Sequence, residues 1–590
     1  MKHIIYLFIL LFAAFTISCD DSFLEENKKQ IEGYTLDSPL FVQPVSEFTE
    51  VSITLPDLKN KDFKVIQYPQ IIHFESFNGH VDDAGLLKLK LKVEEFSMQI
   101  NPGFQDLGTI VLDVAGYGHL AIPVGYLHIG KPFLQMEPSY ITSSSSYSYL
   151  DFGPSNKSIF KIIAGYSGLL FYQIIDYPAW ITFSPENQSH VNELVMLEPN
   201  QSMNYDIRVK RDGLAPGYYE GDIVFISNDI HKEKHSLKVS MLVRDKTTSL
   251  STLPIEGKVV GSTFDKQRNL LYMASHQPNK IQIYDIQNNI RKEVLLSKDV
   301  TSVSLSEDGQ TLFAGQKGLL SVYRSEDLSL LHEINTTFSI NDAVDAMNGF
   351  YYFSNKEDYV GNSFNNLYQF NVLSGEVKKL STPENDMLGG YILKLKNRDN
   401  LLATRSDYTP TGLALIDIST QTPVSLKYWH QDIGRKLWQV NDGSLILSSE
   451  GKIFKTPYNS PDNNLVILEN LKPWGGEEGN FDSQAFRWFD ESSQTQSIWG
   501  IYYGHRALKD YGYDYPQVLE WNKENYQIKR NIEYSHYRTT IDGQTDDYPT
   551  LPHYIFSNST GNKIVLIKNV LREGMPEANA WHLEIIDVTK

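Results

Sequence analysis

Two long insertions near the C-terminus carry the side chains best suited to ligand chemistry. They cover residues 502–516 and 534–552, and both mix tyrosines with acids, histidines and arginines. Aromatic faces stack on the apolar face of a pyranose, while carboxylate and guanidinium groups hydrogen-bond its hydroxyls. These loops are therefore candidates for sugar binding, although tyrosines that only pack the loops together are the preferred interpretation. The candidate ligand-binding residues are Tyr503, His505, Arg506, Tyr511, Tyr513, Tyr515, His536, Tyr537 and Arg538.

The second insertion also contains a weaker candidate for a metal site. Asp542, Asp546 and Asp547 place carboxylates at near-alternate positions, as calcium sites do. The segment lacks the full calcium-loop pattern and a distal bidentate glutamate, so a polar turn is the preferred interpretation. Apart from this weak Ca²⁺ candidate, the sequence predicts no cofactor.

The familiar catalytic motifs are missing from the sequence. It contains no Gly-x-Ser-x-Gly elbow, His-Glu-x-x-His motif, phosphate-binding loop or dinucleotide fingerprint. His505, His536 and His553 are candidates to converge on a metal or to act as a general base, but their spacing matches no metal motif. No catalytic residue is therefore predicted, and binding without catalysis is the preferred hypothesis.

The single cysteine of the chain, Cys19, follows a segment with the order of a secretory signal. A basic start at residues 1–3 precedes an apolar run at residues 4–15, which is too short for a comfortable membrane span. The junction resembles the lipobox of bacterial lipoproteins, with Thr16 in place of the usual leucine. That resemblance implies cleavage after residue 18 and acylation of Cys19. The alternative is a simple cleaved signal with a chance cysteine.

The residues after Cys19 are acidic, with Asp20, Asp21, Glu25 and Glu26 inside an expected flexible tether at 19–30. This cluster resembles the surface-export signals of Bacteroidetes lipoproteins. The resemblance implies an outer-membrane protein, lipid-anchored and facing the cell exterior. The alternative is a solvated tether without an export role.

The composition limits the classes of partner. The chain has 590 residues and a formal net charge of −19, and it offers no basic stripe for phosphates, so nucleic acid is excluded. No apolar stretch beyond the signal approaches a membrane span. With one cysteine there is no intrachain disulfide, so packed cores must supply the stability.

The first part of the mature chain predicts two tandem immunoglobulin-like β-sandwiches, at 31–130 and 131–245. Short alternating strands such as 51–55 and 87–93 favour half-buried sheets. An internal repeat relates residues 63–74 to 171–183. A glycine-led strand follows each copy, and a repeat of about a hundred residues matches one such sandwich.

The second sandwich resembles a BACON-type domain in the segments 177–185, 207–209 and 214–221. Such domains are immunoglobulin-like modules of Bacteroidetes surface proteins and glycosidases. The resemblance implies either carbohydrate binding or a spacer role. We expect Trp180 to pack in the core and Tyr218 to close one end of the sandwich.

Residues 246–590 predict a β-propeller of about seven blades. A two-strand unit such as 270–274 with 281–286 recurs at intervals of roughly 40–50 residues, which is the period of four-stranded blades. Four units end in an apolar–Asp/Asn–apolar pattern, at Asp285, Asn371, Asp417 and Asp587. The chain ends one strand early, so residues 250–253 should supply the outer strand of the last blade. The units resemble YVTN or lactonase-like propellers, since the dipeptides of WD-repeats are missing.

The sequence thus predicts an all-β surface lipoprotein whose propeller is a non-catalytic binding or scaffold head, for glycans, on immunoglobulin-like spacers. The expected partners are the membrane, through the lipid anchor, and a glycan or an envelope protein. One alternative is a propeller enzyme of the lactonase or polysaccharide-lyase kind. Another is a protein-docking scaffold in an envelope complex.

Overall fold

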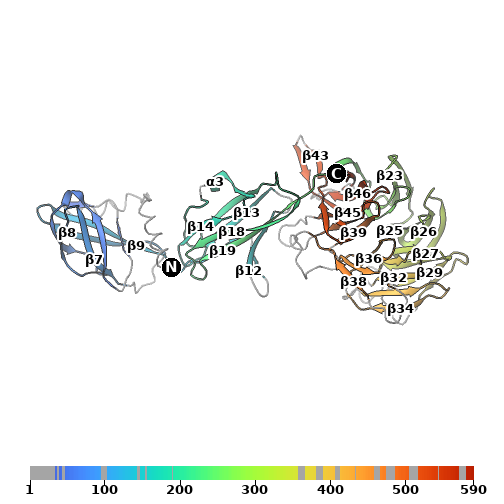
Figure 1. Cartoon of the computed structure of the whole chain (residues 1–590), viewed down its shortest axis with the longest axis horizontal. Coiled ribbons are helices and arrows are strands. Elements are labelled where there is room, and N and C mark those ends of the chain that lie inside the picture. The colour runs from blue at the N-terminus through green and yellow to red at the C-terminus, as the bar shows by residue number, and fades with distance from the viewer. Residues whose placement is uncertain are drawn as a thin grey trace. The chain divides into compact units, whose positions relative to one another are not determined.

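The computed structural model describes a chain built almost entirely of β-strands (Figure 1). The described residues are 33–35, 39–42, 47–94, 102–137, 139–141, 146–152, 156–188, 190–356, 366–380, 390–404, 412–431, 433–457, 465–473, 486–503, 516–541, 544–570 and 580–589. Within them, no helix has the length and apolar character needed to cross a membrane. The candidates Cys19, His505, Arg506, Tyr511, Tyr513, Tyr515 and Asp542 lie outside these residues.

The first sandwich packs two sheets around one apolar core. One sheet has the order β1-β9-β8-β4-β6, with β2 also paired to β9, and the other has the order β3-β7-β5. Leu87, Leu89 and Leu91 of β7 are buried while the lysines between them point outward, so the predicted alternation is confirmed. The strands are β1 (Gly33–Thr35), β2 (Leu40–Phe41), β3 (Thr49–Thr54), β4 (Asp62–Gln67), β5 (Ile72–Phe74), β6 (Asn78–His80), β7 (Leu86–Val93), β8 (Gly103–Val114) and β9 (Gly118–His128).

The second sandwich joins a four-stranded sheet, β10-β13-β17-β15, to a six-stranded sheet, β11-β12-β19-β18-β14-β16. Its core is aromatic: the Phe160 and Tyr205 rings stack 4.9 Å apart, and Phe225 of the other sheet lies 5.9 Å from Phe160. The elements are β10 (Leu134–Glu137), β11 (Ser139–Ile141), β12 (Ser146–Asp151), β13 (Lys157–Ala164), β14 (Leu170–Asp176), β15 (Ile181–Phe183), α3 (Pro185–Gln188), β16 (Val195–Leu197), β17 (Ser202–Val209), β18 (Gly217–Ser227) and β19 (Lys234–Val243).

The internal repeat has a structural counterpart in both sandwiches. β4 pairs with β8 and β14 pairs with β18, and each pairing shifts register at the same repeat position, around Ile66 and around Ile175. A Tyr-Pro step then carries the chain to β5 or β15 in the opposite sheet. A Cβ on Gly221 would lie 2.5 Å from the Pro178 ring, which explains why a glycine begins this part of the second copy.

The two residues singled out in the second sandwich are both only half-buried. Trp180 packs edge-on against Phe152, with ring centroids 6.4 Å apart, so it lies at the border of the core rather than inside it. Tyr218 is half-buried near the expected end of the sandwich. Its neighbour Tyr219 closes the corner by donating its hydroxyl hydrogen to the Ala215 carbonyl at 2.8 Å.

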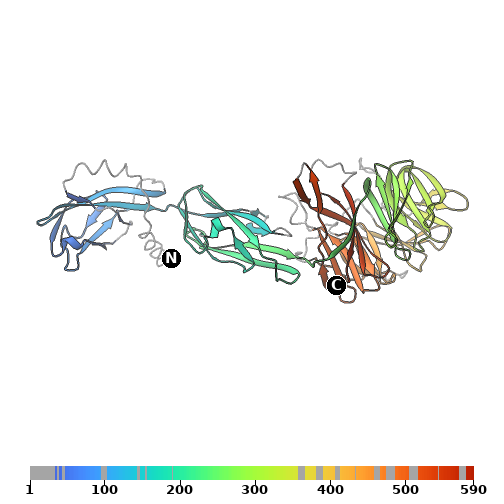
Figure 2. The ribbon, with the colours of Figure 1, turned by 90° about the horizontal axis from the view of Figure 1, so that it is seen from above.

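The remaining sheets form a β-propeller (Figure 2). The described strands of the propeller form five four-stranded sheets and one six-stranded sheet. A separate two-stranded hairpin precedes the last sheet in the sequence. The sheets are β21 (Lys258–Asp265), β22 (Leu270–His276), β23 (Lys280–Asp285) and β24 (Ile290–Leu295); β25 (Val300–Leu305), β26 (Thr311–Arg324), β27 (Leu330–Asp345), β28 (Phe350–Lys356), β29 (Leu367–Asn371) and β30 (Val377–Lys379); β31 (Ile392–Lys394), β32 (Asn400–Thr404), β33 (Leu413–Asp417) and β34 (Val424–Trp429); β35 (Leu437–Val440), β36 (Leu445–Ser448), β37 (Lys452–Lys455) and β38 (Ile467–Asn470); β39 (Phe486–Ser492), β40 (Ser497–Tyr502), β41 (Gln517–Asn522) and β42 (Ile528–Asn531); the hairpin β43 (Tyr537–Ile541) and β44 (Gln544–Tyr548); and β20 (Thr248–Pro254), β47 (Trp581–Asp587), β46 (Lys563–Val570) and β45 (Thr550–Ser557).

The ring closes because a strand from the start of the propeller completes its last sheet, as the sequence predicts. β20 pairs antiparallel with β47, and Leu253 lies opposite Leu583. The segment before β20 is fixed to the preceding sheet, since the Thr247 hydroxyl donates to the Glu533 carbonyl at 2.7 Å. The outer strand of the last sheet therefore comes from the start of the propeller, which leaves the strand β47 paired on both sides.

The recurring Asp/Asn residues cap turns. Each of them ends the strand next to the outermost strand of its sheet, and its side-chain oxygen accepts the backbone N–H two residues later at 2.8–2.9 Å. Except after Asp587, this Asx-turn leads the chain into the outer strand, which explains why a short acceptor side chain recurs there. The residues are Asp285, Asn371, Asp417, Asn522 and Asp587.

Candidate functional site

A cavity of about 270 Å³ lies among the innermost strands of the propeller. Its lining comes from β21, β25, the second part of β27, β31, β35 and β39, together with the residues that directly precede or follow these strands. Side chains that are far apart in the sequence therefore meet at the propeller axis. The polar and aromatic ones include Thr263, Ser304, Glu307, Asp342, Asp345, Tyr391, Lys394, Lys436, Trp438 and Trp488.

β-Bulges in three inner strands each precede a polar or aromatic side chain, and two of these, Asp342 and Trp488, line the cavity. The pairing of the inner strand shifts register just before Asp342 in β27, before Trp488 in β39 and before Tyr554 in β45. Tyr391 and Lys436 directly precede β31 and β35, and thus lie at the same end of their sheets. A bulge bends its strand and redirects the next side chain, which is why bulges are common beside functional sites.

The Lys436 ammonium group lies within a cage of aromatic rings. Its Nζ is 3.6 Å from the ring centroid of Trp488, 4.9 Å from that of Tyr391 and 5.7 Å from that of Trp438. Among the hydrogen bonds and ion pairs of the described residues, none involves this nitrogen. Burial lowers the pKa of Lys436 to about 8, against a smaller opposing effect of Asp342. Cation–π contacts thus replace the usual anionic partner.

Asp342 supplies a carboxylate at the same end of the cavity. Its two oxygens accept the backbone N–H groups of Ala343 and Ile392, each at 3.0 Å. Burial raises the pKa of Asp342 to about 6, although these hydrogen bonds and the charge of Lys436 oppose the shift. At neutral pH this end of the cavity therefore holds the Asp342 carboxylate and the Lys436 ammonium group, which are not in direct contact.

The rings make one wall of the cavity. The Trp488 centroid lies 5.8 Å from that of Trp438 and 4.8 Å from that of Tyr554. The Nε1 donor of Trp438 is buried and finds no acceptor among the described residues. Burial raises the pKa of both Tyr391 and Tyr554, so their hydroxyls stay protonated. A wall of this kind can stack on a ring-shaped ligand and donate hydrogen bonds to it.

The insertion residues that are described take part in packing. Tyr503 is buried, its hydroxyl donates to the Pro552 carbonyl at 2.6 Å, and the Arg487 guanidinium lies 4.9 Å from its ring centroid. These contacts are those expected if the tyrosines pack the loops. The Tyr537 ring is half-buried against His582 at 4.6 Å, while His536 is exposed.

Three further candidates, Arg538, Asp546 and Asp547, belong to the paired strands β43 and β44. Arg538 pairs with Asp547, and Thr539 pairs with Asp546. His553, which the sequence placed with the insertion histidines, contacts the Asn569 side chain at 3.2 Å and lies 4.8 Å from the Trp581 ring. Over the described part of the chain, no group of three or more His, Cys, Asp or Glu side chains is arranged to hold a metal ion.

A larger cavity, of about 620 Å³, lies among β20, β23, β24 and β47. Its central cation, Lys280, is only 3% exposed and already pairs with Glu256 at 2.5 Å and Glu293 at 2.6 Å. Two carboxylates thus satisfy Lys280, whereas Lys436 of the axial cavity has no ion pair among the described residues.

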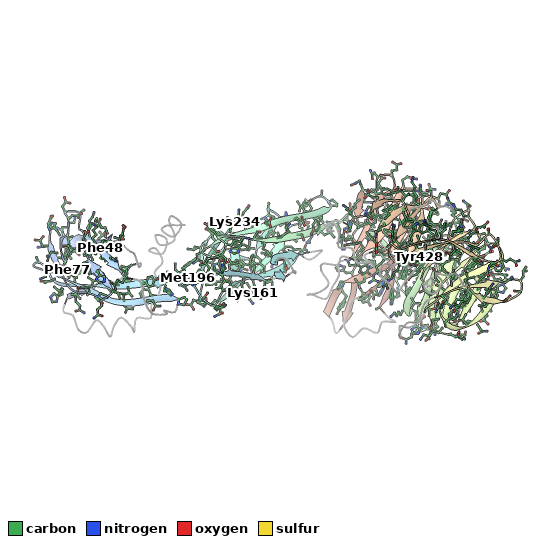
Figure 3. All side chains as sticks on the ribbon, turned by 90° about the horizontal axis from the view of Figure 1, so that it is seen from below. Phe48, Phe77, Lys161, Met196, Lys234 and Tyr428 are labelled. Atoms are coloured by element: carbon green, nitrogen blue, oxygen red, sulfur yellow. The ribbon has the colours of Figure 1, made fainter. Side chains whose placement is uncertain are left out.

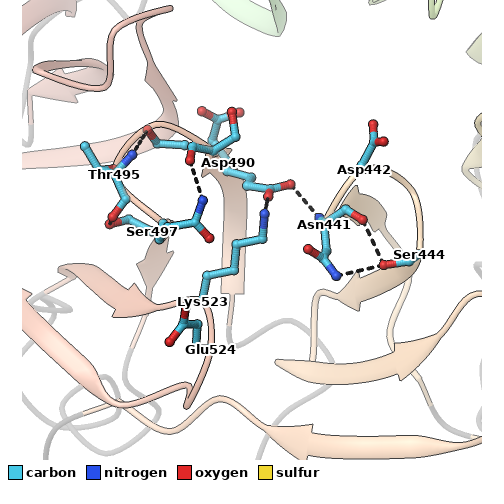
Figure 4. A network of polar contacts seen from close by, with 12 residues as sticks. Asn441, Asp442, Ser444, Asp490, Thr495, Ser497, Lys523 and Glu524 are labelled. Carbon is cyan, nitrogen blue, oxygen red and sulfur yellow. Dashed lines mark hydrogen bonds and ion pairs between the residues drawn. The ribbon is translucent and has the colours of Figure 1, made fainter.

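The far ends of the inner strands are held together by polar contacts (Figure 4). The Glu491 carboxylate accepts the Asn441 backbone N–H at 2.7 Å and pairs with Lys523. The neighbouring Asp490 accepts the Ser557 backbone N–H at 2.7 Å and pairs with Lys266 at 2.9 Å. These contacts join four consecutive sheets around the ring closure, and their groups are mutually satisfied, which indicates a structural role.

The first sandwich presents a separate aromatic surface. Tyr68 and Phe77 are 39% and 42% exposed, and both rings pack against Phe74 (Figure 3). Exposed ring faces of this kind can also stack on a sugar. This cluster consists of the rings of Tyr68, Phe74 and Phe77, without a charged side chain such as Lys436 or Asp342 among them.

Sequence reasoning did not identify the axial residues. Each strand contributes one or two of them, and the strands are separated by whole sheets in the sequence. The available signal was the partial exposure of the first strand in a repeat, such as β25 and β39, which separates it from the fully buried middle strand.

No family model matches the chain, and no curated protein matches it. Among solved structures, the β-propeller domain of Cps50 (Swd1) from Myceliophteria thermophila aligns with 14% identity and a TM-score of 0.42, over 58% of this chain and 100% of that domain. The WD40 repeats of RRP9 align with 11% identity and a TM-score of 0.39, over 58% and 100% of the two chains. U3-55K gives 11% identity and a TM-score of 0.38, over 58% and 98%. No assignment of ligand or activity follows from likenesses at this identity.

Proposed function

We propose that this protein is a lipid-anchored cell-surface protein whose propeller is a non-catalytic binding head for glycans. The signal-like segment before Cys19 supports the anchor, and the acidic residues after it support exposure at the outer surface. The two sandwiches, which share strand order and bulge position, act in this proposal as immunoglobulin-like spacers. The second of them carries the BACON-like segments.

We count seven blades in the proposed head. The six-stranded sheet β25–β30 counts as two blades, because the first part of β26 pairs with β25 and its second part pairs with β27. The second part of β27 in turn pairs with β28 as an inner strand. The four-stranded sheets supply the other blades.

The observation that carries the proposal is the composition of the axial cavity. Rings line one wall, and hydroxyls, three carboxylates and two ammonium groups line the rest. Sugar sites need this combination, since a pyranose has an apolar face and a rim of hydroxyls. Its volume, about 270 Å³, is just below the usual range for ligand sites, so it suits one sugar unit at a chain end.

The test is retention of the full-length protein, in detergent, on immobilised polysaccharides. Retention without release of fragments is expected, and Trp488→Leu should weaken it, because the ring lines the cavity. The matched control is Phe77→Leu, which removes an exposed ring of the first sandwich and should leave retention unchanged. If Phe77→Leu loses retention and Trp488→Leu keeps it, the sugar site lies on the first sandwich and not in the axial cavity. Loss on Tyr511→Ala or Tyr513→Ala would instead place it in the first insertion.

A second candidate is a propeller enzyme. Lys436 with a pKa lowered to about 8 and Asp342 with a pKa raised to about 6 share one cavity, and such shifted pairs are typical of acid–base sites. Release of sugar fragments by the protein, abolished by Asp342→Asn and by Lys436→Met, would favour the enzyme over the binding head.

A further inference from the structure

The Lys436 ammonium group is a donor without an acceptor. Three N–H bonds project from Nζ, the surrounding groups are ring faces, and none of the hydrogen bonds and ion pairs of the described residues involves this nitrogen. Lys436 is half-buried and lines the cavity, so its ammonium group is available to a ligand in that space. An ammonium group held this way is prepared to receive an oxygen from a ligand.

The charges around this lysine are mainly positive at its end of the cavity. The Arg435 and Arg487 guanidinium groups both act on the Tyr391 hydroxyl, where they favour the phenolate. Asp342 is the carboxylate that faces Lys436, and it is held by backbone N–H groups rather than by the lysine. Glu307, Asp345 and Lys394 lie toward the other ends of their strands, where Lys394 and Glu307 approach to 4.0 Å. The full lining has three carboxylates and two lysines, so positive charge prevails only at the end of the cavity that holds Lys436.

We propose that the axial cavity selects ligands that carry a carboxylate, and specifically an acidic sugar whose carboxylate binds the Lys436 ammonium group. This inference rests on the proposed glycan-binding function. The ring of such a sugar would stack on the Trp488 and Trp438 wall, and Asp342 would accept a hydroxyl hydrogen from it. Neutral sugars would make the same stacking contacts but would offer the lysine only uncharged hydroxyl oxygens, which form weaker hydrogen bonds with an ammonium group than a carboxylate does.

The charges give the proposal a pH dependence with a defined sign. Lys436 loses its proton as the pH rises through about 8, so binding of a carboxylate should weaken there. Asp342 gains a proton as the pH falls through about 6, which removes the opposing negative charge, so binding should tighten. The hydroxyls of Tyr391 and Tyr554 stay neutral in this range because their pKa values are raised. A neutral sugar should show neither change.

The test compares each acidic polysaccharide with its own neutral form. Polygalacturonate, alginate and hyaluronan, and the same polymers with their carboxyl groups reduced to alcohols, are titrated into the full-length protein while tryptophan fluorescence is followed. We expect at least one acidic polymer to bind, and its reduced form to bind about tenfold to a hundredfold more weakly, as for loss of a charge-assisted hydrogen bond. Affinity for the acidic form should fall between pH 7 and pH 9.

Variants assign the effect to the cavity. Lys436→Met should lose the preference for the acidic form, whereas Lys436→Arg, which keeps the charge, should retain most of it. Lys378→Met removes one exposed lysine of β30 and controls for net charge. Thermal unfolding of each variant shows whether it folds, and the arginine variant keeps the test valid if Lys436→Met does not.

The outcomes separate this inference from the function on which it rests. Equal binding of the acidic and the reduced forms, or a preference unchanged in a folded Lys436→Met, overturns the carboxylate selection and leaves glycan binding standing. Absence of binding to every polymer, acidic or neutral, overturns the proposed function and this inference together.

Discussion

The most direct test of the propeller is removal of one buried charge from its closing sheet. Lys568 of β46 and Glu584 of β47 form an ion pair at 2.6 Å, and both side chains are 1% exposed. The Glu584 oxygens also accept the Ser535 backbone N–H, each at 3.1 Å. Burial lowers the pKa of Lys568, and the nearby carboxylate opposes that shift. The pair is thus a closed unit in which each charge depends on the other.

Lys568→Met should lower the free energy of unfolding by about 3–5 kcal/mol, because it leaves Glu584 as an uncompensated buried charge. Adding Glu584→Gln should recover most of this loss, since the amide oxygen still accepts the Ser535 N–H without a charge. Lys455→Met, at an exposed position of β37, should change stability by less than about 0.5 kcal/mol.

Urea unfolding of the full-length variants, followed by tryptophan fluorescence, measures these differences. Trp581 lies opposite Asn569 in the same pair of strands and reports on this sheet. A loss of less than about 1 kcal/mol for Lys568→Met would show that the carboxylate is not buried as described. A double variant as unstable as the single one would show that packing, rather than charge, holds the two strands together.

Three further predictions follow from single sites. Gly221→Ala should destabilise the second sandwich by about 1–3 kcal/mol in thermal unfolding, because its Cβ would meet Pro178 at 2.5 Å, whereas Gly217→Ala, whose Cβ has ordinary contacts, should be tolerated. Asp342→Asn should gain melting temperature relative to the native protein as the pH rises from 4 to 7: the raised pKa of Asp342 contributes stability below about pH 4, and that contribution is lost as the pH rises through about 6. Cys19→Ser should move the protein from the membrane fraction to the soluble fraction, and mass spectrometry of the native N-terminal peptide should find an acylated cysteine there; an unmodified thiol would contradict the anchor.

The sequence predicts the propeller well because its middle strands repeat strongly. β22, β40 and β46 are buried along nearly their whole length, since each is covered by neighbouring sheets on both faces. Continuous apolar runs of this kind recur at a fixed period and are easy to recognise. The outer strands, such as β24 and β38, are largely exposed and carry little of that signal.

The candidate site could not be predicted in the same way. Asp342, Tyr391, Lys436, Trp488 and Tyr554 come from five different sheets, and no two of them form a short motif. Their proximity depends on how far each inner strand reaches along the axis, which is a property of the closed ring. Insertions are visible in a sequence because they break a repeat period. The tyrosine-rich loops could therefore be predicted as candidates, whereas the axial residues could not.

One register position recurs in the inner strands and holds residues of very different size. The inner strands β21 and β25 carry the same register shift as β27, β39 and β45, but the residues that follow the shift are Gly261 and Ser302. In β39 and β45 that position holds Trp488 and Tyr554. At Gly261 the neighbouring strand approaches closely, since a Cβ there would lie 3.0 Å from the Val303 backbone nitrogen, whereas the Trp488 ring lines the cavity. The repeated backbone fixes where side chains enter the axis, and the choice of residue in each repeat decides whether that space is filled by the protein or left for a ligand.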